Sequence, residues 1–421
     1  MSFKNLKNVR ICIFGMGHVG LPLACGFLKA GCKVTGVDVV EEVVRSLNNG
    51  ISHIRNEPGV QEILEKNVKN RNFKATTDGM NAVEQSDVVI IVVPLTVNKD
   101  KNPNFDPLKK CCKTISKRLK KGHLICFETT LPPGTTNNLL IPLLEESGLK
   151  AGTDFYVASC PERAMSGRVL KDLESYPKII GGINRKSGHL AGQIYELVFS
   201  KGVILVKNTT TAEAIKIFEG IYRDVNIGLA NELMMICQKH YNVDIKEVIK
   251  AANSQPFCHV HEPGIGVGGI CMPVYPYFLI NKFKEDTKII RNARKTNENM
   301  PKYFVDVLIR KLKAKKKNIK KLRVCVLGLS FRPNVKEHRY SPTFDVVKEL
   351  KKLGAIVSCY DPLYKKNEIM KILKVNGYDN LKKVIDENEA LIIATGYEQF
   401  RNQSFNGKIV VDGRFILKNI S

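Results

Sequence analysis

The sequence predicts an α/β protein with two parallel-sheet domains and a long helix between them. Short apolar runs alternate with helical patterns over the first ~200 residues, and the alternation restarts near Lys320. A long helical pattern without proline lies between these two stretches. The chain has 421 residues, which is too many for one hydrophobic core, so two or three domains are expected.

A series of apolar runs predicts the strands of the first sheet. Helical patterns separate the runs, which indicates a parallel sheet with helices on both faces. The runs are Val9–Phe14, Lys33–Val37, Val88–Val93, His123–Phe127, Phe155–Ser159, Lys178–Gly182 and Val203–Val206.

The long helical pattern extends from Thr211 to about His240. Its apolar residues recur at spacings of three and four, which favours core packing for this stripe. The stripe comprises Ile215, Phe218, Tyr222, Val225, Leu229 and Leu233. It continues into Met234 and Ile236, more apolar surface than one neighbouring helix would cover, so we also expect the helix to form the interface of a homodimer.

A second, smaller α/β domain follows the helix. Its expected strands are Arg323–Leu327, Ala355–Cys359, Leu391–Thr395 and Ile409–Val411. A single glycine, Gly328, follows the first of them, so we do not expect this domain to bind a second dinucleotide.

A glycine-rich turn between the first strand and the first helix predicts a dinucleotide site. Gly15, Gly17 and Gly20 form a G-x-G-x-x-G pattern, which permits a tight turn, close approach of a pyrophosphate, and close packing of helix on strand. The N-terminus of the helix would offer N–H groups to the phosphates. Asp38 ends the next strand, where its carboxylate would accept both ribose hydroxyls and repel a 2′-phosphate. The expected cofactor is therefore NAD.

Charge and hydropathy exclude two classes of partner. The net charge is +25, and the stretch Arg310–Arg323 is strongly basic, but no aromatic residues or recognition motif accompany it, so no nucleic-acid partner is expected. A positive field would instead attract an anionic substrate. No apolar stretch approaches the ~20 residues of a membrane helix, so no membrane partner is expected.

The cysteines indicate a reducing compartment. Twelve of them are spread over the whole chain rather than arranged as a disulfide framework, which predicts a cytoplasmic protein. Cys258, His259, His261 and Cys271 lack paired metal-ligand spacing, so no metal is expected.

The second glycine-rich segment, Pro263–Pro273, contains Cys271 near its end. Glycines let a backbone press against a ligand, and a cysteine at that place can meet the ligand. Beside a dinucleotide fold, a nucleophilic cysteine suggests an oxidation that passes through a thioester.

Ordered blocks over nearly the whole chain resemble the UDP-glucose/GDP-mannose dehydrogenase family, and within it most of all the UDP-N-acetylhexosamine 6-dehydrogenases of the UDP-N-acetylmannosamine type. The blocks are Gly15–Ala24, Glu128–Thr136, Cys160–Gly167, Thr211–Leu233, Gly264–Leu279, Gly328–Pro342 and Asp412–Leu417. The resemblance implies two Rossmann-like doubly wound domains joined by a long central helix that also forms a dimer interface. It implies an NAD-binding domain at residues 1–206, a central helical and dimerisation region with the cysteine loop at 207–305, and a UDP-sugar-binding domain at 306–421.

The resemblance also implies the reaction and the roles of residues. The family oxidises C6 of the sugar to a carboxylate with two NAD per turnover. Cys271 matches the nucleophile, Lys216 the lysine that stabilises the oxyanion at C6, and Glu162 a base or water-orienting carboxylate. The expected cofactor contacts are Gly15, Gly17, Val19, Gly20, Asp38, Pro94, Glu128 and Thr130. The expected substrate contacts are Arg163, Arg223, Gly268, Gly269, Tyr275, Arg332, Arg339 and Arg414.

The chain departs from the family pattern at four places, one of which is Lys336-Glu337, where the family usually has a pair of acids. The other three lie near Lys216 and Cys271. Tyr275 stands where the family usually has Asp, Gly220 where it has Asn, and Ile270 where it has His. The Asp and Asn help to hold the catalytic water, and losing such a group can cost on the order of 10²-fold in rate. Two alternatives therefore stay open: an enzyme that stops after one oxidation or epimerises its UDP-sugar, and a sugar-nucleotide-binding protein without turnover. The sequence does not choose the hexosamine.

Overall fold

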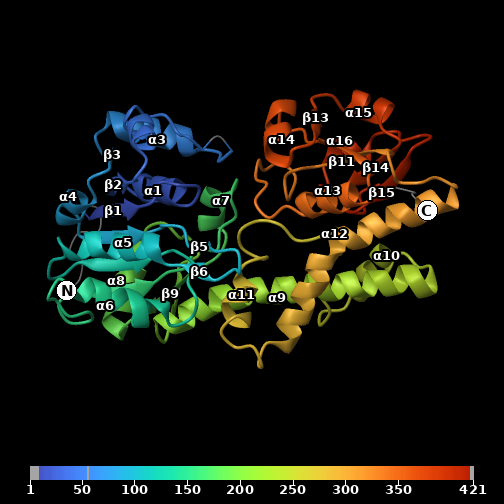
Figure 1. Cartoon of the computed structure of the whole chain (residues 1–421). Helices are drawn as coiled ribbons and strands as arrows, with labels where there is room; N and C mark the ends of the chain where they lie inside the picture. The colour runs from blue at the N-terminus through green and yellow to red at the C-terminus, as the bar shows by residue number, and fades with distance from the viewer. Residues whose placement is uncertain (1–8, 55, 418–421) are drawn as a thin grey trace. The chain divides into compact units, whose positions relative to one another are not determined.

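The computed structural model describes residues 9–54 and 56–417, in two compact units, Met1–Glu219 and Gly220–Ser421 (Figure 1). Helix α9 (Thr209–Ile236) runs through the boundary between the units. Residues 1–8 and 418–421, which the expected first and last domains include, lie outside the described residues. The three domain bounds expected from the sequence stay predictions.

The first unit is built on an eight-stranded sheet in the order β10-β9-β8-β7-β4-β1-β2-β3. The strands are β1 (Arg10–Phe14), β2 (Lys33–Val37), β3 (Phe73–Thr76), β4 (Val88–Ile91), β7 (Leu124–Phe127), β8 (Tyr156–Ser159), β9 (Lys178–Gly182) and β10 (Val203–Val206). All seven runs predicted for this sheet form strands, and β3 is an addition. Neighbouring strands are parallel except β8 and β9, which run antiparallel.

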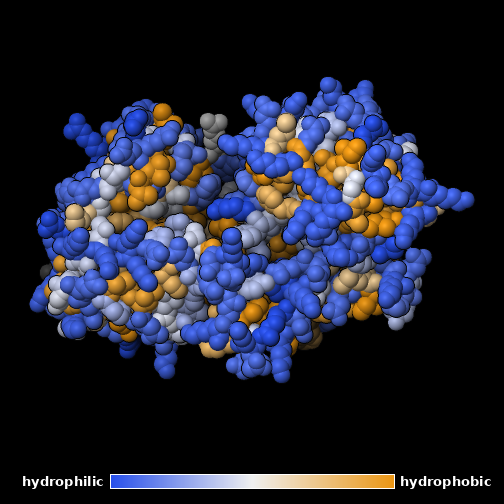
Figure 2. Space-filling model, in the orientation of Figure 1, coloured by the Kyte–Doolittle hydropathy of each residue, from blue (hydrophilic) through white to orange (hydrophobic). Residues whose placement is uncertain are grey.

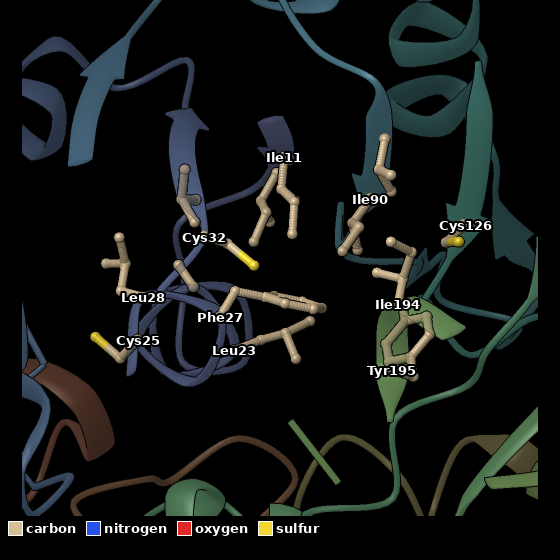
Figure 3. Close-up of a cluster of buried hydrophobic side chains, with 14 of the residues drawn as sticks. Ile11, Leu23, Cys25, Phe27, Leu28, Cys32, Ile90, Cys126, Ile194 and Tyr195 are labelled. Carbon is tan, nitrogen blue, oxygen red and sulfur yellow. The ribbon is translucent and has the colours of Figure 1, made fainter. Parts of the chain in front are cut away.

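Helices cover both faces of this sheet. The elements are α1 (Gly20–Lys29), α2 (Glu41–Asn48), α3 (Val60–Lys69), α4 (Gly79–Glu84), α5 (Asp106–Ser116), a π-helical turn (Thr136–Leu140), α6 (Ile141–Glu145), α7 (Val169–Leu173), α8 (Arg185–Tyr195) and the short hairpin β5 (Thr96–Val97) and β6 (Pro103–Asn104). Alternate strand residues enter two separate cores: Ile11 and Ile90 pack with α1, α3 and α8, whereas Cys12 packs with α4, α5 and α6. Figure 3 shows the first of these cores, in which the rings of Phe27 and Tyr195 meet edge to face at 6.0 Å.

The second unit carries a five-stranded parallel sheet in the order β13-β12-β11-β14-β15. Its strands are β11 (Arg323–Leu327), β12 (Ile356–Tyr360), β13 (Asn376–Tyr378), β14 (Ala390–Ile393) and β15 (Ile409–Asp412). The helices are α10 (Ile245–Ala252), α11 (Tyr275–Ile280), α12 (Lys288–Ala314), α13 (Thr343–Lys352), α14 (Lys366–Leu373), α15 (Leu381–Glu387) and α16 (Glu398–Arg401), with a π-helical turn (Cys237–Tyr241) after α9. The two sheets confirm the predicted fold class of two doubly wound domains and a long central helix.

Three of the six residues of the apolar stripe predicted on the long helix are exposed rather than packed into a core. Phe218, Tyr222 and Leu229 are 55%, 55% and 50% exposed, whereas Leu233 packs against the core of the second unit and Met234, into which the stripe continues, is fully buried there. Core packing was therefore wrong for the three exposed residues but not for the end of the stripe, because a period of 3.6 identifies an apolar face but not what covers it.

Hydrophilic side chains cover most of the surface shown in Figure 2. None of the helices in the described part of the chain is long and apolar enough to cross a membrane.

Candidate functional site

The first glycine turn has the geometry that a dinucleotide needs. Gly15 adopts a φ of 95°, and its N–H donates to the carbonyl oxygen of Val37 at 2.8 Å, which ties the turn to the end of β2. A Cβ on Gly20 would lie 1.8 Å from the carbonyl oxygen of Gly15, so only glycine allows α1 to approach the turn. Both glycines are thus explained by the fold alone.

Gly17 and Asp38 are explained better by a ligand. A Cβ at Gly17 would meet no described atom within 4 Å, so packing does not demand glycine there, whereas an approaching pyrophosphate does. Val19 precedes α1 as its N-cap and makes no side-chain cap hydrogen bond, which leaves the helix N-terminus to a phosphate. Asp38 is half-buried, and it accepts hydrogen bonds from the N–H groups of Met16 (2.9 Å) and Val40 (3.0 Å), which fix its carboxylate beside the turn. These residues fit NAD.

The loops after β4 and β7 lie next to each other at the carboxyl edge of the same sheet, where such folds bind their ligands. The Thr129 hydroxyl donates to the carbonyl oxygen of Val93 at 2.7 Å and so joins the two loops. The predicted contacts Pro94 and Thr130 lie on these loops, exposed and half-buried respectively. Glu128 is the exception, because it points into the protein and is 1% exposed.

A buried lysine, Lys178, binds Glu128 and Glu162 together. Its Nζ lies 2.6 Å from Glu128 Oε2 and 2.8 Å from Glu162 Oε2, and its side chain is 2% exposed. The rings of Tyr195 and Phe199 face the ammonium at 5.2 and 5.0 Å. One cation at the start of β9 therefore links the loops that follow β7 and β8. Sequence reasoning treated Lys178 only as the start of a strand, although a lysine in an otherwise apolar run was a signal.

The two carboxyl groups of this cluster differ in their protonation. Burial raises the pKa of Glu128 to about 7, against the opposing charge of Lys178. Burial also acts on Glu162, but there the charge and hydrogen bond of Lys178 prevail and lower the pKa. Glu162 Oε1 accepts the N–H groups of Arg163 and Ala164, both at 2.6 Å. Glu162 is thus held as a carboxylate with hydrogen bonds to both oxygens, whereas Glu128 is the group that titrates near neutral pH.

The start of α9 is fixed to the same edge of the first unit. Glu213 is fully buried and accepts the N–H groups of Gly134 (2.6 Å) and Thr136 (2.8 Å) and the Thr136 hydroxyl (2.6 Å). Lys216 follows one turn later and is half-buried. Glu213 was missed as a functional residue, and its position in the block that contains Lys216 was the available signal.

The predicted substrate contact Arg163 already has partners within the first unit. Its guanidinium donates to Glu219 Oε1 at 2.8 Å and to the carbonyl oxygen of Pro177, and it lies over the ring of Tyr176 at 5.0 Å. These contacts fix the loop that carries Glu162.

The cysteine loop of the second unit packs against the segment after β11. A Cβ on Gly268 would lie 2.5 Å from Cβ of Phe331, and Gly269 adopts a φ of 87° while its N–H donates to the carbonyl oxygen of Arg339 at 3.0 Å. The glycines therefore let this loop lie flat on residues 331–342. Cys271 lies two residues after Gly269 and is exposed.

Cys271 lies among polar groups of the second unit. The Tyr275 hydroxyl donates to its Sγ at 3.2 Å. The Arg339 guanidinium donates to Glu337 Oε2, and this hydrogen bond is the largest cause that raises the pKa of Arg339, with a smaller contribution from the charge of Cys271. Cys271, Tyr275 and Arg339 thus lie close together in the second unit, and their roles in the reaction stay predictions.

A buried polar network, missed from the sequence, holds the cysteine loop in place. Arg294 on α12 is 2% exposed; it donates to Asp224 on α9 and to the carbonyl oxygen of Met272, next to Cys271. Asn231 accepts the N–H of Gly264 at 2.8 Å, at the other end of the loop. Asn297 joins the two halves, since it donates to Asp224 Oδ1 and accepts from Asn231, both at 2.9 Å. Both ends of the loop are thus fixed to the long helices. The signal for this network in the sequence was the presence of polar residues among the apolar residues of each helix.

The remaining predicted cations lie on different parts of the second unit. Arg414 donates through Nε to the carbonyl oxygen of Ala394 at 2.8 Å, burial lowers its pKa to about 10, and its Nη1 lies 3.0 Å from where a Cβ on Gly264 would be. Arg332 is half-buried over the ring of Phe331. Arg223 is exposed on α9, and its charge contributes to the lowered pKa of His261, after burial and His259.

No group of three or more His, Cys, Asp or Glu side chains within residues 9–54 and 56–417 is arranged to hold a metal ion.

Three domains of one protein family match the chain in succession. The NAD binding domain of the UDP-glucose/GDP-mannose dehydrogenase family matches residues 9–199, the central domain of that family matches residues 210–299, and its UDP binding domain matches residues 325–419. The glycine turn lies in the first match and the cysteine loop in the second.

Relatives and solved structures agree with this assignment. The UDP-N-acetyl-D-mannosamine dehydrogenase of Pyrococcus horikoshii is 37% identical over 97% of this chain and 96% of its own, and that of Campylobacter jejuni is 35% identical over 93% and 96%. The structure of the Pyrococcus horikoshii enzyme has a TM-score of 0.90 at 35% identity, over 98% of this chain and 96% of its own. A UDP-glucose dehydrogenase from Pyrobaculum islandicum has a TM-score of 0.88 at 27% identity, over 99% and 96%. The chain therefore belongs to the UDP-glucose/GDP-mannose dehydrogenase family and is an NAD-dependent nucleotide-sugar dehydrogenase.

Proposed function

We propose that the protein oxidises C6 of a UDP-N-acetylhexosamine to the uronate. UDP-N-acetylmannosamine is the first candidate for this substrate. The observation that carries this proposal is the chemistry of one thiol: of twelve cysteines, all within the described residues, Cys271 alone is exposed, and it ends a glycine-rich loop beside Arg339 and Tyr275. The choice of sugar rests on the relatives named UDP-N-acetyl-D-mannosamine dehydrogenase.

The residues of the first unit would bind and orient the cofactor. Gly17 and the N-terminus of α1 would hold the pyrophosphate of NAD, and Asp38 would accept the ribose hydroxyls. When bound, NAD would supply the oxidising chemistry, as the two-electron acceptor for each of the two oxidations at C6.

The cysteine accounts for the oxidation of an aldehyde. The Cys271 sulfur adds to the aldehyde carbon, and oxidation of this adduct leaves a thioester, which water cleaves to the carboxylate and the free thiol. The Lys216 ammonium offsets the negative charge on the C6 oxygen. Glu162, fixed by Lys178 and two N–H groups, keeps a negative charge in the loop that carries Arg163.

A panel of UDP-sugars tests the proposal. We expect NADH from UDP-N-acetylmannosamine in the presence of NAD, with two NADH per sugar, and none with Cys271→Ala. One NADH per product or an epimerised sugar would support the first alternative, and sugar binding without NADH would support the non-catalytic one; the comparisons favour neither. Absence of NADH from every sugar with folded protein would refute the proposal.

We also propose a homodimer formed through α9. Phe218, Tyr222 and Leu229 leave half of their surface exposed on one helix face, and apolar surface of this kind marks interfaces. Phe218→Glu should convert a dimer to a monomer in light scattering, whereas Met370→Glu, which charges an exposed apolar side chain on α14, should not. A monomeric wild-type mass at micromolar concentration would contradict the proposal.

The cytoplasm is the compartment that we propose. All twelve cysteines are free thiols, as expected in reducing surroundings. A disulfide in protein isolated from its own cells under thiol-blocking conditions would count against this placement.

A further inference from the structure

Tyr275 is held against the reactive thiol by the helix that it begins. It is the first residue of α11, and its N–H donates to the carbonyl oxygen of Cys271 at 2.9 Å, so the two residues lie one helical turn apart. This turn places the Tyr275 hydroxyl 3.2 Å from Cys271 Sγ. A spacing of four residues in a helical turn brings side chains together, so the contact follows from local backbone geometry.

The ring of Tyr275 is fixed from two sides. On one side lies Phe278, which is 4% exposed, with its ring centroid 5.7 Å from that of Tyr275. On the other side lies Gly220 on α9: a Cβ built there would be 3.3 Å from Cδ2 of Tyr275. That distance is tighter than most Cβ contacts, so alanine already requires the ring to shift slightly, and asparagine adds further atoms beside it.

Gly220 and Tyr275 are also two of the positions that depart from the family pattern, which has Asn and Asp there. The departures fit each other sterically, because the missing side chain at residue 220 is what makes room for the ring at residue 275. They also change the chemistry beside the sulfur. A carboxylate can only accept a hydrogen bond, whereas a phenol can donate one.

We propose that Tyr275 is a positioning residue for Cys271, and that Gly220 is the space that it requires. The inference rests on the proposed function of Cys271 as the nucleophile. The hydroxyl donates to the sulfur and holds it in one rotamer, and it stabilises the thiolate through a charge-assisted hydrogen bond. This chain thus supports its sulfur directly at the place where the family pattern has a pair of polar groups.

Alkylation of the protein without cofactor and sugar tests the contact. Tyr275→Phe keeps the ring and removes the donor, so iodoacetamide should label Cys271 roughly 5- to 10-fold more slowly at neutral pH. Tyr277→Phe is the matched control: Tyr277 is on the same helix, and its hydroxyl donates to Glu298 at 2.7 Å instead of to the sulfur. Labelling of Tyr277→Phe should match wild type, and labelling of Tyr275→Phe at the wild-type rate would overturn the proposal.

A double-mutant cycle tests the requirement for space. Gly220→Asn should slow labelling of Cys271 when Tyr275 is present, because the ring and its hydroxyl are displaced. The same change should have no further effect on labelling in the Tyr275→Asp background. Equal effects in both backgrounds would show that the two positions act independently and would refute the pairing.

Turnover separates this inference from the proposed function. In an active enzyme, Tyr275→Phe should lower kcat several-fold and leave KM for NAD unchanged, because the contact is with the sulfur. If no UDP-sugar yields NADH while Tyr275→Phe still slows labelling, the proposed function fails and the positioning role stands. If NADH forms and the labelling rates do not differ, the positioning role fails alone.

Discussion

Replacing Lys178 by Met should destabilise the first unit far more than removal of an ordinary ion pair. The change keeps the length of the side chain but leaves Glu128 and Glu162 buried without their shared cation. Breaking a buried pair by removing one partner costs about 3–5 kcal/mol, because the remaining charge is uncompensated. The control is Lys29→Met: Lys29 pairs with Glu174 at 2.8 Å, but the side chains are 66% and 55% exposed. Such a surface pair contributes about 0–1 kcal/mol.

The destabilisation of Lys178→Met should shrink in acid. In wild type, burial raises the pKa of Glu128 from 4.5 to about 7, so the folded state keeps a proton that the unfolded state has lost, and stability falls as pH rises between these values. The mutant must protonate Glu162 as well, since the charge that lowers its pKa is gone. Each additional retained proton makes the destabilisation about 1.4 kcal/mol smaller for every pH unit by which the solution is acidified.

Denaturant unfolding at mildly acidic and at mildly alkaline pH, followed by circular dichroism, measures both effects. We expect the midpoint of Lys178→Met to be far below wild type at the alkaline pH and closer to it at the acidic one, with Lys29→Met near wild type at both. A double variant, Lys178→Met with Glu162→Gln, should recover part of the loss, because it removes the additional buried charge. A loss no larger than that of Lys29→Met, or one that does not change with pH, would refute the reasoning.

Three further predictions concern the glycine turn and the thiol. Gly20→Ala should lower the free energy of unfolding by several kcal/mol or prevent folding altogether, because its Cβ would lie 1.8 Å from the carbonyl oxygen of Gly15. Gly17→Ala should fold normally and lose at least tenfold in NAD affinity by calorimetry, and normal affinity would show that the turn does not hold the pyrophosphate. Iodoacetamide should label the exposed Cys271 well before Cys325, whose pKa burial raises to about 12, and peptide mapping that finds equal rates would contradict this order.

Most of the fold could be predicted because buried parallel strands are apolar runs. The ranges Lys33–Val37, Lys178–Gly182 and Val203–Val206 match β2, β9 and β10 at both ends. The segments Phe73–Thr76 and Asn376–Gly377–Tyr378 were missed, because each is short, carries polar residues and lies at the edge of its sheet. The antiparallel direction of β9 against β8 could not be read either, since apolar runs have no direction.

The candidate site was predictable where chemistry lies in local motifs. The loop with Cys271 is contiguous in sequence, and the glycine turn and Asp38 lie at the spacing that is characteristic of their motif. The partners that hold them are distant in sequence: Lys178 is separated from Glu128 by fifty residues, and Arg294 from Asp224 by seventy. Such pairs depend on the packing of whole elements, which single-sequence patterns do not report.

The contact between Gly220 and Tyr275 restricts the order in which this site can be altered. A side chain at residue 220 would begin 3.3 Å from the ring while Tyr275 remains, whereas Tyr275→Asp removes the ring before residue 220 changes. Two substitutions separate this chain from the Asn and Asp of the family pattern. The change at residue 220 is sterically unfavourable when it comes first and is relieved when residue 275 has already changed. Laboratory evolution that samples single substitutions should therefore recover Tyr275→Asp before Gly220→Asn, because the cost of the change at residue 220 depends on the side chain already present at residue 275.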